Sequence, residues 1–136
     1  MKATQTQTKK SKSGPSDPVA GQALAQALKY LQNQWKWSGA DLGSVLHIPA
    51  STINHWLARM CVPVTKPYSP DLRAIIALLA IHKDLQAMFE KSEYQRKWLE
   101  TEHPDMGIEP VNKMSESLEG LIGVRQYLDY ARGRGA

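Results

Sequence analysis

The chain has 136 residues, which suits one compact domain or two small helical ones, and its formal net charge at pH 7 is +4. Its single cysteine, Cys61, excludes an internal disulfide and a C-x-x-C zinc site, and it fits a reducing cytoplasm. The N-terminus lacks the apolar segment of a signal peptide, and the longest apolar run, around residues 75–81, is too short to span a membrane. We therefore expect a cytoplasmic protein without a membrane segment.

Charge is distributed unevenly along the sequence. Residues 1–68 carry eight Lys or Arg against two acidic side chains, a net charge of +6, whereas residues 69–136 carry nine against eleven, a net charge of −2. A basic first half and a mildly acidic second half indicate two tasks, one of them toward nucleic acid. Residues 1–15 are mostly Thr, Gln, Ser and Lys, which predicts a disordered basic arm, either a solvated tail or a segment that contacts phosphates.

The first predicted helix begins at Asp17-Pro18, because proline in the first turn has no N–H to leave unsatisfied. Its apolar residues recur at i, i+4, i+7 and i+11 and form one face: Leu24, Leu28, Leu31 and Trp35. The stretch 37–57 that follows has the pattern of a helix-turn-helix. Ser38 and Asp41 predict a capped first helix, and Gly43 leaves room for a second helix to cross closely. His47 falls where the chain must turn, and histidine adopts left-handed geometry more often than most residues do.

The second helix of this motif follows Pro49, which cannot continue the first, and we expect Ser51 or Thr52 to cap it. Its inward residues recur at i, i+3 and i+4: Ile53, Trp56 and Leu57. The polar residues on the other face are those that a recognition helix turns toward the major groove, and they are the candidate DNA-binding residues: Ser51, Thr52, Asn54, His55 and Arg59. Asn54 can pair with adenine. Two ordinary core helices joined by a short turn are the alternative.

Residues 68–90 predict a long helix after a proline-containing loop, with Ser69 as its cap. Its apolar residues occupy more than one side of the helix: Leu72, Ile75, Ile76, Leu78, Leu79, Ile81, Leu85 and Met88. Such a helix must be buried on more than one side, so we expect either a strut between the two halves or part of a dimer seam. His82 lies beside this face and is interpreted as a surface or hydrogen-bonded histidine, not a metal ligand.

The rest of the chain predicts only short helices and loops. Ser92 with Gln95 has the spacing of a capping box, residues 102–110 form a turn-rich loop, and Pro110 starts a short helical turn. A last helix begins after Ser117, and we expect glycines near residue 133 to end it. No alternation is long enough for a sheet, so the predicted fold class is all-α, with an N-terminal helix-turn-helix bundle and a smaller C-terminal helical domain.

Residues 88–134 contain an ordered set of motifs: Phe89, Trp98-Leu99, Pro104, Gly107, Pro110, Gly120 and a final helix. This order is similar to the toxin-binding domain of the Xre/MbcA/ParS antitoxins, and residues 18–67 resemble the Xre-type helix-turn-helix of the same proteins. Two departures concern the loop, where Ile108 follows Gly107 although the family often has a second glycine, and the stretch after Pro110, which is not rich in leucine.

The resemblance implies an antitoxin with a basic arm at 1–15, a helix-turn-helix domain at 16–67, a connecting or dimerisation helix at 68–90 and a toxin-binding domain at 91–136. Its partners would be a RES-domain toxin that consumes NAD, or an ADP-ribosyltransferase relative, and operator DNA through which the complex represses its own operon. We also expect a homodimer, because one helix-turn-helix reads only a half-site. No cofactor, metal ion or membrane is expected.

The candidate toxin-binding residues lie on the last helix and its tail: Arg125, Tyr127, Tyr130, Arg132 and Arg134. Tyr and Arg are common anchors of interfaces, and guanidinium groups match the oxyanions of a nucleotide pocket or the acidic residues at its rim. A solvated C-terminus is the alternative. Trp98 and Leu99 are expected to pack inside the small domain.

Three other function classes compete with the antitoxin. A stand-alone repressor would share the helix-turn-helix but have no toxin, and a structural adaptor would not bind DNA. An enzyme is disfavoured, because His55 and Cys61 are the nearest approach to a nucleophile–base pair and no third group orients them. The sequence also lacks G-x-S-x-G, H-E-x-x-H and phosphate-loop motifs.

Overall fold

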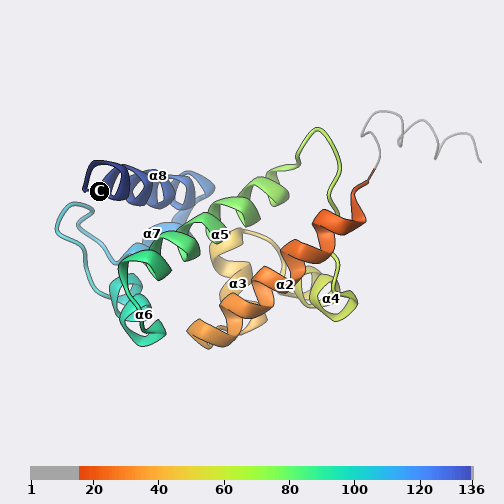
Figure 1. The fold of residues 1–136 in the computed structure, drawn as a ribbon, viewed down its shortest axis with the longest axis horizontal. Helices are drawn as coiled ribbons and strands as arrows, with labels where there is room; N and C mark the ends of the chain where they lie inside the picture. The colour runs from red at the N-terminus through yellow and green to blue at the C-terminus, as the bar shows by residue number, and fades with distance from the viewer. Residues whose placement is uncertain (1–15, 136) are drawn as a thin grey trace, which may run out of the picture.

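The structure, a computed structural model, describes residues 16–135, with side chains up to residue 133; the predicted basic arm at 1–15 lies outside the described residues. The described chain is all-α, as predicted, and contains no strand, only an isolated bridge between His103 and Ile108. Its helices are α2 (Pro18–Trp35), α3 (Gly39–Leu46), α4 (Ala50–Arg59), α5 (Pro70–Met88), α6 (Ser92–Glu100), α7 (Pro110–Glu116) and α8 (Leu118–Gly135) (Figure 1). Within the described range no helix is long and apolar enough to cross a bilayer.

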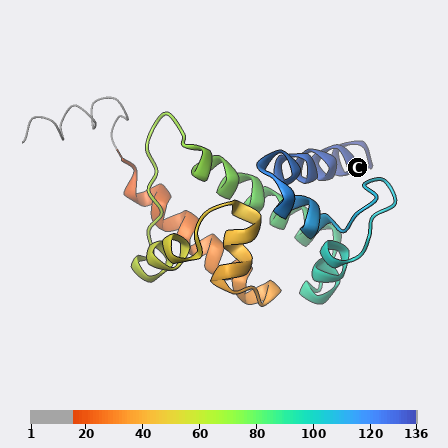
Figure 2. The same cartoon turned by 180° about the vertical axis from the view of Figure 1, so that it is seen from behind.

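Helix α5 runs through the middle of the molecule, with α2 and α4 toward one end and α6 and α8 toward the other (Figure 1 and Figure 2). It contacts α2, α3, α6 and α8, and these neighbours bury residues around most of its circumference, including Ile75, Leu78, Ile81 and Leu85. The apolar residues on several sides of α5 are therefore covered by the same chain, which agrees with the predicted strut.

One hydrophobic core extends from Ala25 in α2 through α5 to Leu128 in α8 and crosses the predicted domain boundaries. A buried hydrogen bond joins the two halves directly, since Trp35 Nε1 donates to Gln95 Oε1 at 2.9 Å. Gln95 Nε2 in turn donates to the carbonyl oxygen of Phe89 at 3.0 Å. The helix-turn-helix and the C-terminal helices are thus packed on each other and do not hang from a flexible linker.

Most predicted helix starts are confirmed by their caps. The Asp17 carboxylate accepts from the N–H of Ala20 at 3.0 Å, and the Ser69 hydroxyl accepts from the N–H of Leu72 at 3.1 Å. The capping box predicted at Ser92 is wrong: Lys91 is the N-cap and forms no side-chain cap bond. Because α6 starts at Ser92, Gln95 is one position too far along to cap it and turns into the core.

Two other predicted helix ends are wrong. Helix α4 is capped by Pro49 and not by Ser51 or Thr52, because the carbonyl oxygen of Pro49 already accepts from the N–H groups of Thr52 and Ile53. Helix α8 does not end at Gly133 but continues to Gly135. An ion pair of 2.7 Å between Arg132 and Asp84 of α5 holds the last turns of α8 against the molecule, which offsets the low helix propensity of glycine.

Candidate DNA and partner-protein interfaces

The turn between α3 and α4 has the geometry that its sequence predicts. Ser38 and Asp41 form a reciprocal capping box, with bonds of 3.0 and 2.8 Å between each side chain and the other residue's N–H. His47 adopts left-handed geometry at φ 62°, and its N–H donates to the carbonyl oxygen of Gly43 at 2.8 Å. A Cβ at Gly43 would lie 2.6 Å from the carbonyl oxygen of Ile48, so only glycine allows the turn to fold back this closely.

The same turn is hydrogen-bonded to the C-terminal half by contacts that were not predicted from the sequence. His47 Nε2 lies 2.9 Å from the carbonyl oxygen of Met114, to which a protonated Nε2 donates. Nearby, the Ser44 hydroxyl donates to the Ser115 hydroxyl at 3.3 Å, so α3 is bonded to α7 at two points. These partners are more than 60 residues apart in the chain, and no local pattern pairs them.

Helix α4 presents the predicted polar face. Ile53 and Leu57 are buried, and Thr52 is half-buried. The other four candidate DNA-binding residues are exposed: Ser51, Asn54, His55 and Arg59. A Cβ at Gly39 would collide with the side-chain oxygen of Asn54, so the start of α3 lies directly beside this face. The structure therefore brings the predicted residues together on one surface.

Two electrostatic features accompany this face. Helix α4 begins without a side-chain cap bond, so no side-chain oxygen covers the positive end of its dipole, and Arg59 supplies a cation in its last turn. A hollow of about 310 Å³ lies beside His55 and Arg59, and Ser16 lines it as well. Ser16, the first described residue, therefore lies near the candidate DNA-binding residues His55 and Arg59.

The candidate toxin-binding residues of α8 are mostly engaged within the molecule. Arg125 pairs with Asp129 at 3.5 Å, Arg132 pairs with Asp84, and the hydroxyl of Tyr127 donates to Asp105 at 2.9 Å. Burial and the bond to Asp105 raise the pKa of Tyr127. Of the two others, Tyr130 is 63% exposed and the side chain of Arg134 lies outside the described residues.

Two carboxyl groups, of Asp84 in α5 and Asp129 in α8, lie together near the end of α8, and no local sequence pattern predicts this pair. Asp84 is buried, and its Oδ2 atom has no hydrogen-bond donor among the described residues. The pKa of Asp129 is raised, mainly by a hydrogen bond with Asp84 and to a smaller extent by burial, although Arg125 acts in the opposite direction. Arg132, at 2.7 Å from Asp84 Oδ1, places a positive charge beside this pair.

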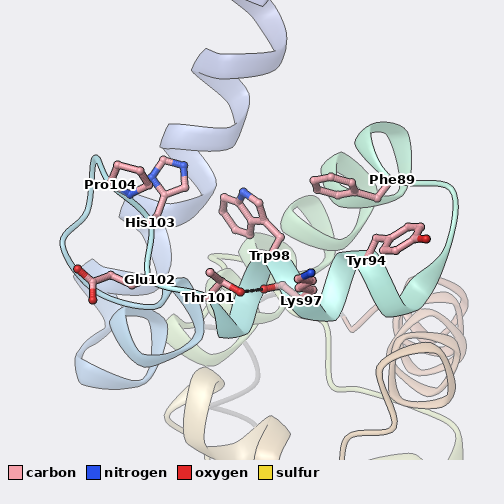
Figure 3. A pocket seen from close by; sticks show the side chains of 8 residues that line it. All are labelled: Phe89, Tyr94, Lys97, Trp98, Thr101, Glu102, His103 and Pro104. Atoms are coloured by element: carbon pink, nitrogen blue, oxygen red, sulfur yellow. Dashed lines mark hydrogen bonds between the residues drawn. The ribbon is translucent and has the colours of Figure 1, made fainter.

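An open hollow of about 590 Å³ lies between α6 and the loop after it. We call it the aromatic hollow; it is lined by Phe89, Tyr94, Lys97, Trp98, Thr101, Glu102, His103 and Pro104 (Figure 3). Leu99 is buried as expected, but Trp98 is only half-buried and packs on the core with one side while its other side lines the hollow. The spacing i, i+4 of Tyr94 and Trp98 was the signal available in the sequence.

Side chains that could bind a metal ion or act in catalysis can be located in the described part of the chain. No group of three or more His, Cys, Asp or Glu side chains there is placed to hold a metal ion. His55 and Cys61 line one hollow, but the thiol of Cys61 donates to the carbonyl oxygen of Val62 at 3.9 Å and not to the imidazole. No protein-family model matches the chain, and no curated protein sequence matches it.

Proposed function

We propose that this protein is a DNA-binding antitoxin that acts in the cytoplasm. In this proposal α4 reads operator DNA as part of a homodimer, and the C-terminal helices bind and block a RES-type toxin that consumes NAD. The observation that carries the proposal is the close α3–turn–α4 unit with an exposed polar face, because a recognition helix needs such a face on a rigid support.

The chemistry of the α4 face supports contacts to duplex DNA. The amide of Asn54 offers the donor and acceptor that match the major-groove edge of adenine, while His55 and Arg59 offer donors to bases or phosphates. The start of α4 has no side-chain cap bond, and the positive end of its helix dipole favours a phosphate oxygen. Two copies are needed to read a palindromic site.

The DNA-binding part is tested by the double variant Asn54→Ala, His55→Ala in a gel-shift assay with the DNA upstream of its own operon. Loss of a bidentate base contact costs about 1–3 kcal/mol, so we expect binding to fall by about tenfold or more. The matched control removes two exposed polar side chains from α2, Gln26→Ala and Asn33→Ala, and should shift the DNA like the wild type. An unchanged shift by the α4 variant would show that another surface reads DNA.

The toxin-binding part is tested by co-expression with the product of the neighbouring gene. Deletion of residues 130–136 should release the toxin, seen as growth arrest and a fall in cellular NAD. This deletion also removes the partner of buried Asp84, so it is compared with the same deletion carrying Asp84→Asn, which has no charge to leave unpaired. Full protection by either folded truncation would contradict a role for the tail.

The α4 face supports the stand-alone repressor equally well. The two functions differ in whether a toxic protein is encoded beside this one and co-purifies with it. A chain that shifts its upstream DNA but binds no neighbouring gene product would favour the repressor.

A further inference from the structure

The aromatic hollow is built from three separate segments of the C-terminal half. Phe89 follows α5, Tyr94 and Trp98 belong to α6, and His103 and Pro104 belong to the loop beyond it. Figure 3 shows Trp98 in the middle, with Phe89 and Tyr94 on one side and His103 and Pro104 on the other. The end of α5, helix α6 and a loop closed by a bond of 3.1 Å from the N–H of His103 to the carbonyl oxygen of Ile108 hold these rings in place, so the hollow is preformed.

Much of the apolar surface here is left in contact with water. Tyr94 is 48% exposed and the neighbouring Met88 is 41% exposed, although the core a few residues away is fully packed. Exposed apolar patches that include Trp and Tyr in a concave setting are typical of the anchoring centres of protein interfaces. The surface that lines the hollow is mostly apolar, which favours an apolar occupant over a small polar ligand.

A chain of ring contacts joins the hollow to the candidate toxin-binding helix. The ring centroids of Trp98 and His103 lie 5.7 Å apart, and those of His103 and Tyr127 lie 5.0 Å apart. His103 Nε2 is also within hydrogen-bond distance of the Tyr127 hydroxyl, at 3.2 Å. The hollow therefore lies directly beside Tyr127, one of the candidate toxin-binding residues of α8.

The lysines at the α6 edge of the hollow favour a bound side chain that has an acidic residue beside it. Lys97 of α6 lines the hollow, and the ammonium group of Lys91 lies 6.0 Å from the centre of the Tyr94 ring, whereas the acidic lining residue, Glu102, lies on the loop after α6. Both lysines are exposed. Lys91 lies near the ring of Tyr94, and Lys97 lines the hollow together with Trp98. A carboxylate beside an apolar side chain would meet these ammonium groups while the apolar part enters the hollow.

We propose that the aromatic hollow anchors the toxin by taking one large apolar or aromatic side chain of that protein, next to an acidic residue that meets Lys97. This inference rests on the proposed function and adds the position and chemistry of the main apolar contact. Burial of the open ring faces provides affinity, and the charged edge sets the register of the partner on α6.

The test measures binding of the neighbouring gene product to the full chain carrying Tyr94→Ala or Lys97→Glu. Both altered side chains are exposed, so both variants should keep the wild-type circular dichroism and melting temperature. We expect each to raise the dissociation constant at least tenfold. The matched controls are Tyr68→Ala, an exposed tyrosine on the loop before α5, and Lys29→Glu on α2, which should bind like the wild type.

A second measurement reports on the hollow directly. In protein labelled with 5-fluorotryptophan, the Trp98 fluorine resonance, identified by its loss in Trp98→Phe, should move when the partner is added. The resonance of Trp56 on α4 serves as the internal reference and should not move. A photo-crosslinker at position 94 should then attach to an apolar segment of the partner that contains an acidic residue.

The outcomes separate this inference from the proposed function. If the wild type binds the neighbouring gene product and the Tyr94 and Lys97 variants bind equally well, the anchor is contradicted while the antitoxin function stands. If the variants instead convert a dimer into a monomer in light scattering without any partner, the hollow is a seam between two copies and the anchor is again wrong. If the wild type binds no neighbouring gene product, the proposed function fails first, and the anchor fails with it.

Discussion

A single buried histidine illustrates how strongly one residue can couple this fold to pH. His82 is almost completely buried, its Nε2 donates to Gln34 Oε1 at 2.8 Å, and its ring packs edge-on against Trp35. Burial lowers the pKa of His82 from 6.5 to about 4. Of the two predicted alternatives, a surface or a hydrogen-bonded histidine, burial contradicts the first and the bond to Gln34 confirms the second. No local pattern indicates this bond, because Gln34 lies 48 residues before His82.

This burial predicts a loss of stability in acid. Between pH 6.5 and about 4 the unfolded chain binds a proton at His82 that the folded chain does not, so the free energy of unfolding falls as the pH falls through that window. The full effect of this one group is about 3 kcal/mol. Urea unfolding of His82→Gln at pH 7 and pH 4.5 should show a smaller loss than the wild type. His55→Gln, an exposed histidine, is the control, and an equal loss in all three proteins would contradict the assignment.

At the scale of the helices, local patterns carried most of the prediction. The caps at Asp17, Ser38 and Ser69 and the turn at His47 each depend on residues three to five positions apart, and all are confirmed. The wrong capping box at Ser92 shows where local patterns fail. Gln95 has the right spacing from Ser92, but its side chain instead accepts a hydrogen bond from Trp35, 60 residues earlier. Contacts of that range, like the pair of Arg132 with Asp84, follow from packing and have no signature in the local sequence.

The close crossing of α3 and α4 gives a prediction for one glycine. Gly43→Ala places a Cβ against the carbonyl oxygen of Ile48, which belongs to the backbone and cannot rotate away, so we expect a loss of about 1–3 kcal/mol in unfolding free energy. Gly133→Ala in α8 is the matched control: its Cβ meets nothing within 4 Å, so the better helix propensity of alanine should raise stability by up to about 1 kcal/mol. Thermal melts of both variants check the two signs, and equal effects would contradict the crossing geometry.

The whole molecule is organised by one core although its sequence divides into two halves of opposite charge. The shared core means that a partner on α6 or α8 and DNA on α4 would act on the same folded unit, joined through α3 and α7 at His47 and Met114. The sequence pattern predicted separate domains because each half has its own complete set of helix signals. The bonds that join the halves involve single polar residues such as Gln95. In the sequence such a residue resembles any polar residue of a short helix, because its partner Trp35 lies 60 residues earlier.

This shared core predicts that the chain unfolds as one cooperative unit. Gln95→Ala leaves the indole N–H of Trp35 buried without its acceptor, which costs about 1–3 kcal/mol. If the halves are one unit, hydrogen exchange of the slowest amides should accelerate by the same factor in α2 and α3 as in α6 and α8, because all of them exchange through global unfolding. Gln86→Ala, which removes the longer bond to Gln34 at 3.3 Å, is the matched control and should have a smaller effect. Acceleration confined to α6 and α8, or two separate unfolding transitions, would show that the halves fold independently and that the joint with Trp35 is only a contact between domains.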